Sequence, residues 1–89
     1  MIICYINNVP SVLLVNGYRF FFFSNEGYPL EPCHIHVRKH GALAKYWIGG
    51  RVELAENDGF SAKELKEIGI IIHDNEKILM EAWNGFFVR

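Results

Sequence analysis

The segment EPCHIHVRKH, residues 31–40, concentrates the side chains of this chain that could do chemistry, including three of its four histidines. The imidazoles of His34 and His36 could act as general base and general acid on an RNA phosphate, because histidine titrates near neutral pH. Arg38, Lys45 or Lys39 could then hold the phosphoryl charge. The two histidines are therefore the candidate catalytic residues.

Metal binding is a second use of the same histidines. Imidazoles at positions i and i+2 of one strand face can reach the same Zn²⁺, but a third and a fourth ligand are required. Cys33 would point away from His34 in a strand, so a remote donor such as His73, or a distorted strand start that turns Cys33 round, would be needed. Because only two ligands are aligned, the sequence predicts no metal and no other cofactor.

Recognition is a third use of this segment. In a strand, His34, His36 and Arg38 lie on one face, and the apolar residues between them lie on the other. If the following strand adds Lys45 and Trp47, that face becomes a cationic surface with an indole, on which an acidic partner or a base could rest. The expected binding residues are therefore His34, His36, Arg38, Lys45 and Trp47. The same alternation is typical of any half-buried antiparallel strand, so the pattern alone also fits a strand without a functional role.

Length and composition indicate a single globular domain, residues 1–89. Hydrophobic residues make up 51% of the chain and charged residues 21%, which argues against a disordered tail or a coiled coil. No apolar run approaches the roughly 18 residues that span a bilayer, and the start of the chain has no basic n-region. Cys4 and Cys33 are too few for a disulfide framework. We therefore expect a soluble, cytoplasmic protein with reduced thiols and no membrane association.

Charge is unevenly distributed along the chain. Residues 1–52 contain five Lys and Arg against two Asp and Glu, a net charge of +3, whereas residues 53–89 contain four against eight, a net charge of −4. Such a dipolar arrangement can orient a partner or pair the molecule with a copy of itself. The overall net charge of −1 favours a protein over a nucleic acid as that partner.

Period-two patterns predict antiparallel strands in the first half of the chain. Asn16-Gly17, which tolerate positive φ, predict a hairpin between residues 11–15 and 18–24. Residues 25–32, with one Gly and two Pro, are expected to form a surface loop. A second hairpin is predicted between residues 34–38 and 42–48.

The C-terminal third changes to a helical period. Ser61 and Glu64 have the spacing of a capping box, and helices are predicted near residues 61–73 and 75–87. Because the strands precede the helices, the expected fold class is α+β, with an antiparallel sheet of three to five strands followed by a C-terminal two-helix hairpin packed on one face. The helical residues expected to pack on the sheet are Leu65, Ile68, Ile72, Leu79 and Trp83.

Several blocks of the sequence, in order, resemble one small bacterial family. They are GYRFFFFSNEG (17–27), EPCHIHV (31–37), AKYWI (44–48), VELAENDGFSAKEL (52–65) and ILMEAW (78–83). Together they resemble the family catalogued as domain of unknown function 4160. Members of that family are often encoded beside another small protein of unknown function, which implies a two-protein module of toxin and antitoxin type. The family brings no established activity, so the resemblance implies no catalytic residue.

The run YRFFFF, residues 18–23, is apolar on both faces, where an outer strand would alternate. Two helices cover only one face of a sheet, so Phe21 and Phe23 must be covered by curling of the sheet or by another chain, and we favour another chain. The sequence therefore predicts a homodimer or a complex with a small cognate protein, with nucleic acid as the less favoured partner.

Taken together, these patterns favour a small cytosolic protein-interaction or regulatory module, one member of a bacterial pair of toxin and antitoxin type. The alternative is an RNA-processing or metal-dependent enzyme centred on the strand that carries His34 and His36. The sequence leaves open whether the chain has enzymatic activity.

Overall fold

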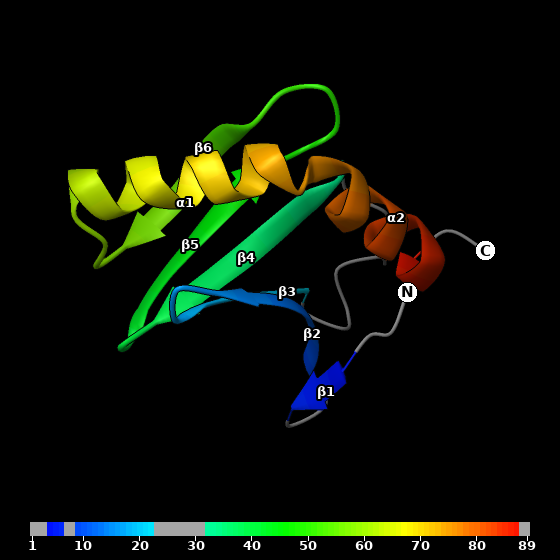
Figure 1. Ribbon diagram of the computed structural model, residues 1–89, viewed down its shortest axis with the longest axis horizontal. Helices are drawn as coiled ribbons and strands as arrows, with labels where there is room; N and C mark the ends of the chain where they lie inside the picture. Colours follow the sequence, from blue (N-terminus) through cyan, green and yellow to red (C-terminus); the bar gives the residue numbers. More distant parts are fainter. Residues whose placement is uncertain (1–3, 7–8, 23–31, 88–89) are drawn as a thin grey trace.

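A computed structural model describes residues 4–6, 9–22 and 32–87. The strands form one antiparallel sheet in the order of the sequence, each pairing with the next. Figure 1 shows α1 lying across one face of this sheet and α2 following it at the end of the sheet. The elements are β1 (Cys4–Ile6), β2 (Val9–Val15), β3 (Tyr18–Phe21), β4 (His34–Lys39), β5 (Ala42–Trp47), β6 (Glu53–Asp58), α1 (Ala62–Asp74) and α2 (Glu76–Phe87).

The predicted α+β class, with an antiparallel sheet before two C-terminal helices, is confirmed. In the part of the chain that the structure describes, the sheet has six strands where three to five were expected, because the three-residue β1 adds an edge beside β2. Neither helix in the described part of the chain is long and apolar enough to cross a membrane.

Two tight turns close the β2–β3 and β4–β5 hairpins. Both central residues of each turn have positive φ. The values are 52° and 81° at Asn16-Gly17, and 49° and 83° at His40-Gly41. This conformation matches the right-handed twist of the strands that it joins. The predicted Asn-Gly turn is confirmed, and His40 adopts the same conformation although positive φ is uncommon for a residue with a side chain.

The predicted capping box begins α1. The Ser61 hydroxyl accepts from the Glu64 amide at 3.2 Å, and the Glu64 carboxylate accepts from the Ser61 amide at 2.9 Å. Only Asn75 separates the two helices, and its side-chain amide donates to the Ile71 carbonyl at 2.8 Å. Figure 1 shows α2 bending away at this residue instead of folding back along α1. The bend carries α2 to the end of the sheet.

The start of α2 is tied to the connection between β5 and β6. The Glu76 carboxylate accepts hydrogen bonds from the backbone amides of Gly49 and Gly50, both at 3.2 Å. These glycines have φ of 103° and 98°, which a residue with a side chain rarely adopts. The contact helps to determine where α2 lies relative to β5.

The core lies between the helices and one face of the sheet. Of the helical residues predicted to pack there, Ile68, Ile72, Leu79 and Trp83 are buried as expected, and Leu65 is partly buried at the margin. The indole of Trp83 meets the ring of Phe22 edge-on at 5.4 Å between centroids. The buried cluster consists of Tyr18, Phe20, Phe22, Ile35, Val37, Ala44, Tyr46 and Ile48 from the sheet and its ends, with Phe60, Ile68, Ile71, Ile72, Leu79, Ala82 and Trp83.

We expect Trp83→Ala to lower the free energy of unfolding by about 3 to 5 kcal/mol, because it empties a buried aromatic site. Equilibrium urea denaturation followed by circular dichroism measures the change. Ile70→Ala is the matched control, because Ile70 lies on α1 with 55% of its surface exposed. The control should change stability by less than about 0.5 kcal/mol. A similar small loss for Trp83→Ala would remove this residue from the core.

Candidate functional site

The register of the sheet places the side chains on the face opposite the helices in three rows across the strands. Directly paired residues of antiparallel strands share a face, so each row follows from the pairing. We call this face, opposite the helices, the histidine face. Its rows are Leu14, Arg19, Arg38, Leu43 and Asp58 at the end near the tight turns, then Ser11, Phe21, His36, Lys45 and Glu56, then His34, Trp47 and Glu53.

The five sequence-predicted binding residues do share this face, but they are not equally accessible. His34 has 0% of its surface exposed and His36 has 7%. Arg38 is exposed, whereas Lys45 and Trp47 are half-buried. The prediction of an exposed histidine surface is therefore wrong, and only the Arg38 end of the strand faces solvent freely.

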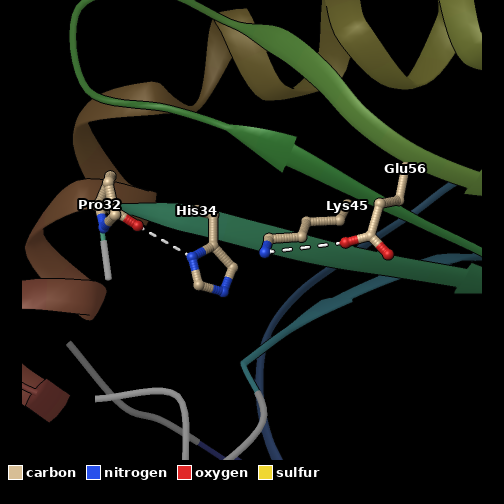
Figure 2. A network of polar contacts seen from close by, with 4 residues as sticks. All are labelled: Pro32, His34, Lys45 and Glu56. Atoms are coloured by element: carbon tan, nitrogen blue, oxygen red, sulfur yellow. Dashed lines mark hydrogen bonds and ion pairs between the residues drawn. The ribbon is translucent and has the colours of Figure 1, made fainter. Parts of the chain in front are cut away.

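His34 is held inside the fold by a hydrogen bond and by aromatic contacts. Its Nδ1 lies 2.9 Å from the carbonyl oxygen of Pro32, as Figure 2 shows. A carbonyl oxygen only accepts, so Nδ1 carries the proton in this contact. The ring lies 4.7 Å from Trp83 and 5.5 Å from Trp47, centroid to centroid. His34 thus joins the start of β4 to α2, because the bend after α1 brings Trp83 to this end of the sheet.

His36 and Phe21 cover each other on the histidine face. Their rings stack at 5.6 Å with an interplanar angle of 26°, and the guanidinium carbon of Arg38 lies 5.3 Å from the centre of the Phe21 ring. Phe21 is only 2% exposed as a result. The chain itself therefore covers Phe21, and the expectation that another chain was needed for it is wrong. Phe23, the other half of that prediction, lies outside the described residues.

Lys45 has partners within the chain. Its Nζ lies 4.5 Å from the centre of the Trp47 ring and 3.8 Å from the Glu56 carboxylate, the ion pair drawn in Figure 2. Its side chain is 12% exposed. These contacts hold Lys45 against the sheet. Arg38 is therefore the one exposed cation among the predicted binding residues.

The geometry restricts what the two histidines could do in catalysis. An acid and base pair must both reach the substrate. His36 and Lys45 line an open hollow of about 300 Å³ beside β6, whereas His34 has no exposed surface. The rings lie 5.3 Å apart and nearly perpendicular. His36 is thus the accessible member of the pair, and a mechanism that needs both is disfavoured.

No group of three or more His, Cys, Asp or Glu within the described ranges is placed to hold a metal ion. Cys33 is half-buried beside Gly49. Burial, and secondarily the negative charge of Glu76, raise the pKa of its thiol to about 11. A thiol with this pKa stays protonated at neutral pH and is a poor nucleophile.

Sequence reasoning missed the cationic end of the histidine face. Arg19 lies directly opposite Arg38, and both line a hollow of about 190 Å³ together with the turn residues. Counting outward from Asn16-Gly17 would have paired Leu14 with Arg19, which the structure does. The pairing of Arg19 with Arg38 was not readable, because it joins two separate hairpins.

A family model matches residues 17–84, and its description is Domain of unknown function (DUF4160). The chain belongs to this family, as its blocks of sequence indicated. The match includes β3, β4, β5, β6, α1 and most of α2. It therefore covers the whole of the strand that carries His34 and His36. Searches of curated proteins and of solved structures gave no match.

We expect His34→Ala to lower the free energy of unfolding by about 2 to 4 kcal/mol, because it empties a buried ring site and leaves the Pro32 carbonyl without its donor. His34→Phe keeps the ring and removes only the donor, so it should lose about 1 to 3 kcal/mol. Denaturant unfolding measures both. The control is His73→Ala, since His73 is exposed on α1. Equal stability of His34→Ala and the control would show that the buried contacts of His34 contribute nothing.

The thiol of Cys33 supplies a pH-dependent prediction. Its pKa is raised from 9.0 to about 11 in the folded protein, so its contribution to stability is present below pH 9 and is lost as pH rises toward 11. In a Cys4→Ser background, iodoacetamide should alkylate Cys33 slowly at pH 9, with the rate rising toward pH 11. The urea-unfolded protein is the control and should react with its midpoint near pH 9. A folded-state midpoint at or below that of the unfolded protein would contradict burial of the thiol.

Proposed function

We propose that this protein is a small cytosolic interaction module that binds a cognate protein partner, as one member of a bacterial pair of toxin and antitoxin type. The observation that carries the proposal is the row of side chains at the turn end of the histidine face. There Leu14 is 68% exposed and lies beside Arg19, which pairs with the exposed Arg38. Arginine is enriched in protein interfaces, and an exposed leucine beside it supplies apolar area.

Self-association through the same patch is less favourable than binding a different protein. A twofold contact brings identical surfaces together, so the patch that carries Arg19 and Arg38 would face the same patch of the second copy. Like charges brought together at an interface cost free energy. The burial of Phe21 also removes one apolar reason for a homodimer. The chain belongs to the DUF4160 family. The expectation that members of this family are encoded beside a second small protein favours that neighbour as the partner.

The burial of His34 favours a binding role over the two-histidine enzyme. A binding surface needs only Arg38 and its neighbours to be accessible, whereas the enzyme needs both imidazoles to reach a substrate. Protein is also favoured over nucleic acid, because β6 presents Glu53, Glu56 and Asp58 on the same side of the sheet and all three are exposed.

We expect Leu14→Asp to weaken the complex with the protein encoded by the neighbouring gene on the order of tenfold or more, because it places a charge in the apolar part of the contact. Isothermal titration calorimetry on the two purified proteins measures the affinity. The matched control is Ile70→Asp, which changes another exposed apolar residue, on the helical side of the molecule. It should bind as the unchanged protein does.

Two results would overturn this proposal. Co-expression that yields no complex with the neighbour's product would remove the partner. A complex weakened by Ile70→Asp and not by Leu14→Asp would place the contact on the helices. Growth tests complete the experiment, because a pair of toxin and antitoxin type requires that one protein relieve the growth inhibition caused by the other.

A further inference from the structure

The two tight turns of the sheet lie beside each other at one end of the molecule (Figure 1). The ammonium of Lys39, at the end of β4, donates to the carbonyl of Asn16 in the β2–β3 turn at 2.9 Å. A Cβ added to Gly17 would lie 3.2 Å from the Lys39 side chain, so glycine lets this side chain cross the turn closely. The β2–β3 turn is thereby attached to the β4–β5 hairpin, and residues of both surround one open hollow.

Four cationic or titratable side chains surround that hollow, and we call them the turn cluster: Arg19, Arg38, Lys39 and His40. Arg19 and Arg38 are direct cross-strand partners. Like charges directly opposite each other destabilise a sheet. Among the described residues, no ion pair to a carboxylate neutralises either arginine. The fold therefore tolerates an unfavourable pair of charges at this place.

Glu64, a carboxylate on which Lys39 and His40 act, is only partly available to the turn cluster. The pKa of Glu64 is lowered mainly by its hydrogen bond with the backbone of Ser61, with smaller contributions from Lys39 and His40. Within the described residues neither Arg19 nor Arg38 forms an ion pair with a carboxylate, and Glu64 is committed to capping α1.

We propose that the turn cluster is an oxyanion site, which binds carboxylates from an acidic segment of the protein partner. This inference rests on the proposed function, since the acidic segment belongs to that partner. Two guanidinium groups on one face present planar forks of N–H donors that match carboxylate geometry. An incoming carboxylate converts the repulsion between the arginines into attraction to a shared anion. Leu14 and Leu43, which flank them in the row, supply apolar contact for the rest of the segment.

The surroundings of the turn cluster favour an acidic protein segment over a nucleic acid. The two arginines of the histidine face lie together at its turn end, whereas Lys45 in the next row is paired with Glu56. The row of the arginines ends at β6 with Asp58, which is exposed. A phosphate backbone that followed the row would meet this carboxylate, and nucleic-acid binding depends on many phosphate contacts along a basic track. A short acidic segment needs only the local cluster.

The site can be tested without the partner, by titrating the ¹⁵N-labelled protein with a capped hexaglutamate peptide at low salt and following amide shifts. The amides of Gly17 and Gly41 should move, because both glycines line the hollow. Arg19→Gln and Arg38→Gln should each weaken binding on the order of tenfold. Arg51→Gln is the matched control, because Arg51 is also exposed but pairs with Glu53 at 3.4 Å. It should leave the affinity unchanged.

Thermal stability supplies a second readout, because the like charges of Arg19 and Arg38 repel each other in the free protein. The melting temperature of Arg19→Gln should equal or exceed that of the unchanged protein. A marked decrease would show that Arg19 is structural and would overturn the inference. The absence of peptide binding, equal loss in the Arg51→Gln control, or tighter binding of a single-stranded RNA hexamer than of the peptide would also overturn it.

The two proposals fail in different ways. A complex with the neighbour's product that forms normally in Arg19→Gln and Arg38→Gln, but not in Leu14→Asp, would refute the oxyanion site and leave the interaction module standing. Peptide binding at the turn cluster without any complex would refute the assigned partner and leave the oxyanion chemistry standing.

Discussion

Strand β4 is buried on both faces over its first four residues, and the rest of the structure depends on how those faces are filled. On the helical side Ile35 and Val37 are inaccessible, and on the other side His34 and His36 are almost so. A strand buried on both sides ordinarily carries apolar residues alone. Here imidazoles fill one side, and a buried imidazole must keep its polar atoms paired. The hydrogen bond from His34 to Pro32 meets that requirement at the start of the strand.

The packed histidines determine where the polar chemistry of this face can operate. His34 is enclosed by indoles from β5 and α2, and His36 is stacked on Phe21. Accessibility therefore increases along β4 toward its end, where Arg38 is exposed. The first half of the segment that looked most like an active site is packed inside the fold, and its most exposed side chains lie beside the turns.

The cross-strand pair of Arg19 and Arg38 departs from the local rules that the rest of the sheet obeys. Elsewhere the turns, caps and alternation agree with the fold, which is what a stable domain requires. Proteins commonly retain an unfavourable local arrangement where binding uses it. The charge asymmetry between the two halves of the chain is consistent with this interpretation, because most of the acidic residues lie on β6 and the helices, and among the described residues neither arginine forms an ion pair with a carboxylate.

The sequence by itself determined the features that depend on neighbours in the chain. These are the Asn16-Gly17 turn, the Ser61 capping box, the order of strands before helices, and the alternation that places His34 and His36 on one face. Each follows from backbone geometry over a few residues, so each could be predicted. The side chains that cover a face are determined by contacts between distant segments, and only the tertiary structure decided these contacts. Trp83 reaches His34 because the chain bends at Asn75, and Arg19 faces Arg38 because two hairpins pair in one register. Periodicity assigns a residue to a face, but it carries no information about the angle between helices or the register between hairpins, and these decided which residues are buried and which remain to bind.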